Sequence, residues 1–138
     1  NEVRYLGNYI VSARYFKCSL SKCKRSVYSA TNAIFGKIGR IASDEVFLHL
    51  MYSKCVPILM YGLACYDMTK TDLKSLDFTV TRVLMKLFRT TNMDIITDCM
   101  HFFVVKLPSE MWRDRVDRFA KNYTRNINRL CHLYADVM

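Results

Sequence analysis

Glycine and proline are scarce in this sequence, with four and two residues respectively among 138. Sandwiches and barrels need many turns, and turns are built largely from these two residue types. About half of the residues are hydrophobic, so a chain of this length can bury a substantial core. Few turn residues together with many apolar ones predict one compact domain that is mostly α-helical.

The six cysteines lack the spacing of a metal site or of a disulfide framework, because no C-x-x-C pair occurs. Cys99 and His101 are neighbours, as are Cys131 and His132, but neither pair has the usual zinc spacing. We therefore expect reduced thiols, used as small core residues of an intracellular protein in the nucleus or cytoplasm, with no metal and no cofactor. A zinc site is the alternative.

A catalytic constellation is also missing. The three histidines fall in separate predicted helices, no serine or cysteine lies in a nucleophile elbow, and no glycine loop has a phosphate-binding pattern. The sequence starts without an initiator methionine or a signal-peptide pattern. We expect a piece of a longer protein with no activity alone, and a small enzyme is the least favoured alternative.

No apolar run is long enough to favour a membrane span over a buried helix. Residues 46–66 are nearly all apolar, but Lys54 and Pro57 interrupt them, whereas a span needs about 20 apolar residues. This pattern predicts a central core helix that begins after Ser43 and is kinked or broken before Pro57. We expect apolar residues of this helix and of the last helix to be largely buried: Ile58, Leu59, Leu63, Trp112 and Phe119.

The remaining periodicities predict helices around this element. Apolar residues recur every three or four positions from residue 19 to Ile41, from 71 to 90, after Asn92, and from Pro108 to Val137. Residues 3–12 have a strand-like pattern around Gly7 and Asn8, which predicts a hairpin or a bent strand pair. The prediction is four or five helices packed round a central apolar helix, with a hairpin at 1–14 and a helical domain at 15–138.

Acidic residues are absent between Lys17 and Ser43, although the net charge of the chain is +9. The predicted helix there, Lys17–Arg40, has a polar face with basic side chains on it and on its flanks: Lys22, Lys24, Arg25, Lys37 and Arg40. A second, weaker basic stripe holds Arg82, Lys86 and Arg89. Such a surface is typical of proteins that contact phosphates, so these five residues are the candidate nucleic-acid site. Solvated cations without a ligand are the alternative.

Three short pieces, in this order, resemble the segment after the catalytic palm in reverse transcriptases of non-LTR (LINE-type) retrotransposons. They are Tyr5-Leu6-Gly7, then Gly39-Arg40-Ile41, then Lys54-Cys55-Val56-Pro57-Ile58-Leu59-Met60-Tyr61-Gly62-Leu63. The later pieces Ser75-Leu76-Asp77-Phe78, Met85-Lys86-Leu87-Phe88 and Leu107-Pro108-Ser109 are similar to jockey- or CR1-like elements. Each motif alone is unspecific, and their order and spacing carry the resemblance.

The resemblance implies that Tyr5, Leu6 and Gly7 occupy a primer-grip-like position and that the basic helix belongs to a thumb. A thumb cradles the template–primer duplex, whether RNA–DNA or DNA. The palm, with its catalytic aspartates, is missing from this sequence, so we expect the segment to bind nucleic acid weakly and to have no polymerase activity alone. The expected partners are template–primer nucleic acid and the palm domain, with no membrane. A helical protein-interaction module, with its basic face on an acidic partner, is the alternative.

Overall fold

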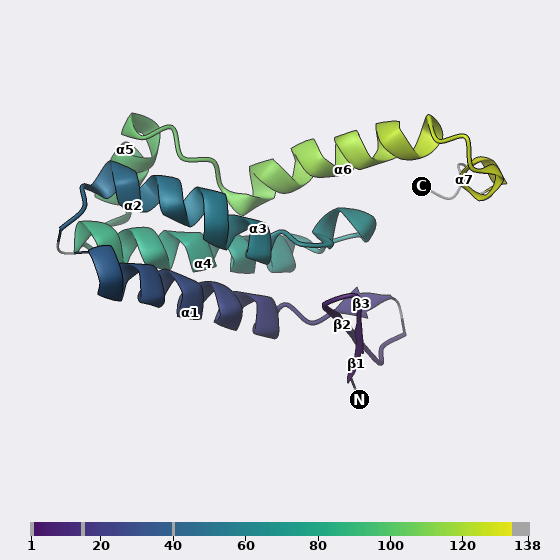
Figure 1. Cartoon of the computed structure of the whole chain (residues 1–138), viewed down its shortest axis with the longest axis horizontal. Helices are drawn as coiled ribbons and strands as arrows, with labels where there is room; N and C mark the ends of the chain where they lie inside the picture. The colour runs from purple at the N-terminus through teal and green to yellow at the C-terminus, as the bar shows by residue number, and fades with distance from the viewer. Residues whose placement is uncertain (1, 15, 40, 134–138) are drawn as a thin grey trace.

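The computed structural model describes residues 2–14, 16–39 and 41–133, and it confirms a mostly α-helical fold. A small sheet precedes helices α1 (Ser21–Ile38), α2 (Asp44–Leu50), α3 (Val56–Leu59), α4 (Lys70–Phe88), α5 (Met93–Phe102), α6 (Pro108–Thr124) and α7 (Arg129–Leu133). Helices α1, α2 and α4 run along the long axis, and the sheet lies at one end of α1 (Figure 1). Within the described residues, no helix is long and apolar enough to cross a membrane.

The N-terminal sheet contains the predicted hairpin and one strand more. Strands β1 (Glu2–Tyr5) and β2 (Asn8–Val11) pair antiparallel, with Tyr5 opposite Asn8 across a two-residue turn. A third strand, β3 (Lys17–Cys18), pairs with β2. The expected helical start at Lys17 is therefore wrong. A strand of two residues is too short to show the alternation that predicts strands.

The regular α-helix is interrupted before Pro57, where the sequence predicts a kink or a break. A π-helical turn, η1 (Met51–Cys55), connects α2 to α3, and the Val56 N–H donates to the carbonyl of Met51. Proline has no N–H, and its ring would clash with the carbonyl four residues earlier in a regular helix. The wider turn accommodates Pro57 without ending the element, as π-bulges do. Ser43 is at the predicted N-cap position, with extended backbone, but its side chain makes no capping hydrogen bond.

The core is formed where this central element meets α1 and α4. Phe47, Met51, Leu59 and Leu63 are buried against apolar residues of the two neighbouring helices: Val27, Leu76, Val80 and Leu84. The predicted burial is confirmed for Leu59 and Leu63, and it is wrong for Ile58, which is 41% exposed. Trp112 and Phe119 are half-buried. Ile58 is about 100° from Leu59 around the helix. It therefore lies with Pro57 on the solvent-facing side.

The last predicted helix ends early. Helix α6 stops at Thr124, and α7 starts at Arg129. Between them, the Asn126 side chain accepts a hydrogen bond from the Asn128 N–H (2.9 Å), and the Asn128 side chain accepts one from the Leu130 N–H (2.9 Å). Asparagine turns of this kind compete with the helical hydrogen bonds. The expected continuation to Val137 reaches past Leu133, the last described residue.

Two neighbouring substitutions test the position of the central element. Leu59→Ala removes a fully buried side chain and should lower the free energy of unfolding by about 2–5 kcal/mol. Ile58→Ala removes a side chain that is 41% exposed and should cost about 1 kcal/mol or less. Urea denaturation of the two variants and the parent measures both. Equal losses at the two positions would show that α3 is not oriented as described.

Candidate nucleic-acid interface

The clearest candidate surface is a groove between α1 and α4, which lie side by side (Figure 1). Two adjoining cavities of about 530 and 310 Å³ share Asn32 and Lys86. Four basic side chains, one from α1 and three from α4 and its C-cap, line them: Lys37, Arg82, Lys86 and Arg89. We call these four residues the α1–α4 basic groove. Among the described residues that line it, none is acidic.

Contacts between the two helices position the groove. The Lys86 ammonium donates to the Asn32 side-chain oxygen (2.8 Å) and lies 5.1 Å from the centre of the Phe35 ring. Residues 82, 86 and 89 lie on one side of α4 because they are four and three positions apart. Lys86 is in the last turn of α4, where the helix dipole favours a cation. The groove thus combines positive charge with an aromatic ring and an amide.

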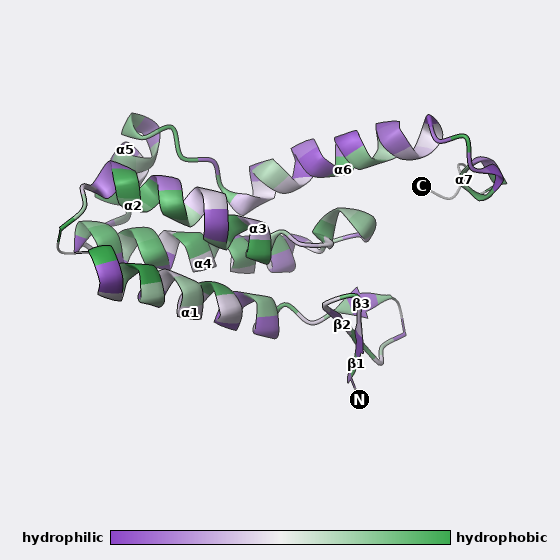
Figure 2. Cartoon of the chain, in the orientation of Figure 1, coloured by the Kyte–Doolittle hydropathy of each residue, from purple (hydrophilic) through white to green (hydrophobic). Residues whose placement is uncertain are grey.

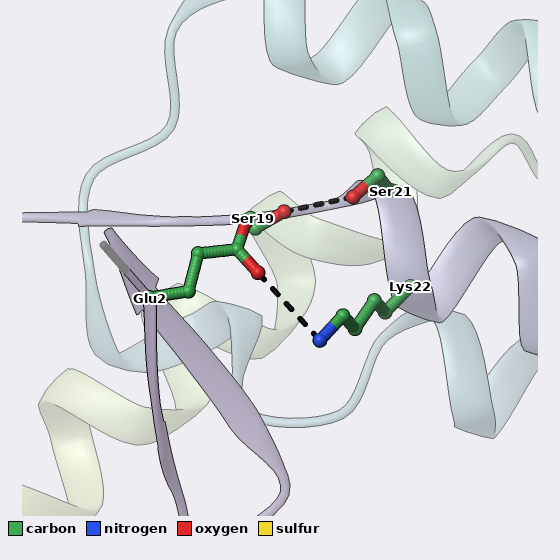
Figure 3. A network of polar contacts seen from close by, with 4 residues as sticks. All are labelled: Glu2, Ser19, Ser21 and Lys22. Carbon is green, nitrogen blue, oxygen red and sulfur yellow. Dashed lines mark hydrogen bonds and ion pairs between the residues drawn. The ribbon is translucent and has the colours of Figure 1, made fainter. Parts of the chain in front are cut away.

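A second basic cluster lies where the sheet meets the start of α1. Arg4, Lys22 and Arg25, the hairpin basic cluster, line a cavity of about 620 Å³ together with Tyr9 and Tyr61. The Lys22 ammonium is 3.6 Å from a Glu2 carboxylate oxygen (Figure 3). It also lies 3.6 Å from the centre of the Tyr9 ring. The ion pair is exposed, and exposed pairs contribute little, so Lys22 can exchange Glu2 for a phosphate.

The five predicted site residues do not all come together. At 3.6 residues per turn, Lys22, Arg25 and Lys37 lie on the same third of α1. They fall at its two ends, about 22 Å apart at 1.5 Å per residue. Lys24 is on the other side of α1, where its ammonium donates to the Ser75 hydroxyl of α4 (2.7 Å), so it does not belong to this face. Arg40 lies outside the described residues.

The sequence pattern did not show that Lys37 of α1 lines one groove with the basic stripe of α4. Arg82, Lys86 and Arg89 were a separate and weaker stripe, because helical periodicity gives the face of each helix but not its neighbour. The absence of acid among the groove residues is visible only after α1 and α4 are packed together. The contacts of Lys86 on α4 with Asn32 and Phe35 on α1 were not indicated by any pattern in the sequence.

The primer-grip-like residues form the tip of the hairpin. Leu6 and Gly7 both have positive φ (45° and 85°), as a type I′ turn requires, and Tyr5 and Leu6 are 63% and 71% exposed. A Cβ on Gly7 would lie 3.3 Å from the Tyr61 ring. Gly62 also has positive φ (71°), and a Cβ there would overlap the Asn8 side chain. Two of the motifs that carried the family resemblance therefore meet in space.

The described residues of this interface form no cluster of metal-binding side chains. Across the described part of the chain, no three or more His, Cys, Asp or Glu residues are placed to hold a metal ion, and the six cysteines are free thiols. Burial raises the pKa of the Cys18 and Cys23 thiols above the usual value, which disfavours the reactive thiolate. What the interface offers chemically is cations, amides and aromatic rings, groups that can contact phosphates and stack on bases.

Comparison with protein-family models, with curated proteins and with solved structures found no match.

Two glycine substitutions test how the hairpin is held. Gly62→Ala puts a side chain at positive φ, which costs about 1–2 kcal/mol, and pushes against Asn8. Gly36→Ala is the control, because a Cβ there meets nothing within 4 Å inside α1, and it should stabilise the fold by about 0.5–1 kcal/mol. Urea unfolding gives both signs, and the amide NMR shift of Asn8 reports hairpin docking. A neutral Gly62→Ala that leaves Asn8 unchanged would contradict this packing.

Proposed function

We propose that this chain is a non-catalytic, thumb-like segment of a LINE-type reverse transcriptase and that it grips duplex nucleic acid. The observation that carries the proposal is the α1–α4 basic groove, in which four cations gather without an acid among the lining residues. The order of the sequence motifs supports it independently. The ligand would be a template–primer duplex, RNA–DNA or DNA, and such a ligand places the protein in the nucleus or cytoplasm.

The spacing of the basic residues suits a duplex backbone. Lys22 and Lys37 are about 22 Å apart along α1, which corresponds to about six base pairs at 3.4 Å each. Lysine and arginine side chains bind phosphates without reading bases, as a polymerase needs when it holds any template. The hairpin basic cluster and the α1–α4 basic groove would then contact the same duplex at two places along α1.

The aromatic residues add a second type of contact near the sheet. Tyr61 is 58% exposed beside Arg4 and Arg25, and Tyr5 is 63% exposed at the hairpin tip. Exposed tyrosines beside cations can stack on bases at a strand end. In the proposed arrangement, the hairpin would hold the strand end and α1 with α4 would hold the duplex behind it. The reaction itself would need the palm domain and its metal-binding aspartates.

Binding across a salt series tests the proposal. The groove variant combines Lys37→Ala, Lys86→Ala and Arg89→Ala, and the hairpin variant combines Lys22→Ala and Arg25→Ala. Each lost phosphate contact should lower the slope of log K against log salt by about 0.9. The slope should therefore fall by nearly three and two units respectively, with little dependence on duplex sequence. The probe is an RNA–DNA hybrid, measured by fluorescence anisotropy.

A matched control separates local contacts from total charge. The variant Lys54→Ala, Lys70→Ala, Arg113→Ala removes the same number of exposed cations away from both clusters. It should change the slope much less than the groove variant does. Equal slopes for these two variants would overturn the proposal, since charge alone would then explain binding. Competition by polyglutamate, without competition by duplex, would favour an acidic protein partner instead.

A further inference from the structure

The second half of α6 extends beyond the body of the protein. Its first half is held by three hydrogen bonds: the Ser109 N–H to the Asp77 carboxylate (2.8 Å), the Trp112 indole N–H to the Leu63 carbonyl (2.8 Å), and the Arg115 guanidinium to the Met60 carbonyl (3.3 Å). Met111 and Trp112 pack on the core, but no later apolar side chain among the described residues of α6 does. Figure 1 shows α6 running past the ends of the other helices. We call residues 116–133, with α7, the arm.

The arm has an apolar stripe that is half-buried along α6 and exposed in the residues that follow α6. Residues at three- and four-residue spacing form it along α6: Val116, Phe119, Ala120 and Tyr123. Figure 2 shows hydrophilic residues along one edge of α6 and more apolar ones along the other. Ile127, Leu130 and Leu133 continue the apolar character and are 95%, 61% and 64% exposed. An isolated helix with one apolar face is marginal in water, so this stripe indicates a contact surface.

An apolar groove lies between α2 and the segment that follows α5. Its cavity is about 700 Å³, and its main lining residues are Leu48, Tyr52, Phe102, Phe103, Val104 and Met111. Phe102 and Val104 are 78% and 81% exposed. Val104 also has positive φ (52°), a strained conformation for a β-branched residue. We call this site the α2–α5 groove. Exposed apolar side chains held by a strained backbone mark it as a second contact surface.

The two surfaces carry opposite charge. Residues 44–53 and 91–110, which surround the α2–α5 groove, contain five acids and one lysine. Glu45 lines the groove, and Glu110 is near enough to Tyr52 to help burial raise the pKa of that hydroxyl above its usual value. The arm has four basic residues and one acid: Arg118, Lys121, Arg125 and Arg129 against Asp117. Such complementarity favours contact between these surfaces over pairing of like with like.

The positions of the two surfaces exclude contact within one molecule. The arm points away from α2 and α5, which lie at the other end of the long axis (Figure 1). A copy displaced along that axis would bring its α2–α5 groove under the arm of the first. We propose that the arm of one copy occupies the α2–α5 groove of a second copy, in a head-to-tail contact. Contacts of this kind form chains or rings, because each copy keeps one free surface of each type. The inference does not depend on nucleic-acid binding.

Complementation between two variants tests the contact. The arm variant is Phe119→Gln with Tyr123→Gln. The α2–α5 groove variant is Phe102→Gln with Val104→Asn, because asparagine tolerates the positive φ of residue 104. Sedimentation equilibrium of the parent should show a mass rising with concentration above the 16.2 kDa of one chain. Each variant alone should associate at least tenfold more weakly. Their equimolar mixture should form a dimer and stop there, because only one arm and one groove remain intact.

The control carries matched changes at the hairpin tip, Tyr5→Gln with Leu6→Asn, which replace an exposed aromatic and an exposed apolar residue at positive φ. It should assemble as the parent does. A parent that stays monomeric at every concentration would overturn the proposal. Assembly of the α2–α5 groove variant alone would also overturn it, because arms would then pair with each other. Failure of the mixture to associate would overturn it as well. An arm variant that alters only duplex affinity, with a monomeric parent, would assign the arm to nucleic acid instead.

Discussion

The rest of the structure depends on the burial of one interrupted helix. Residues 44–59 have one apolar face, and this face is stable in water only when other helices cover it. Pro57 prevents a regular helix at this point, and the π-helical turn keeps the chain continuous while it accommodates the missing N–H. After α3 ends, Gly62 in the left-handed region lies against Asn8 of the hairpin. Core burial and hairpin docking are thus consequences of the same short segment.

The packing of helices α1 and α4 against the central element also determines where the charged residues lie. Helix α1 places its apolar side on the central element and its polar side outward. Helix α4 packs beside it, so that Lys86 reaches Asn32 and the α4 cations line one groove with Lys37 of α1. Four of the twelve acids lie in α2 and α5, at the far end from the basic arm. A chain with net charge +9 therefore has distinct basic and acidic regions, each suited to a different partner.

The candidate site was only partly predictable, because the sequence pattern indicates the faces of each helix but not which helices pack together. Lys22, Arg25 and Lys37 could be placed on one side of α1 because helical geometry fixes their relative angles. Lys24 was assigned to a flank of that side, whereas it contacts Ser75, a residue 51 positions later in the chain. Arg82, Lys86 and Arg89 were recognised as basic but not as part of the same groove. Pairing between distant elements depends on packing, which single-helix periodicity does not contain.

The sequence by itself determined the helical class, the break before Pro57, the start of α6 at Pro108 and the hairpin turn at Gly7, because each follows from local backbone chemistry. The tertiary structure decided strand β3, the exposure of Ile58, the end of α6 at Thr124 and the groove between α1 and α4. These features depend on which surfaces face each other and on how a few asparagine side chains compete with the helical backbone. Interactions between residues far apart in the chain, or between nearly equal local alternatives, are settled only when the whole core is packed.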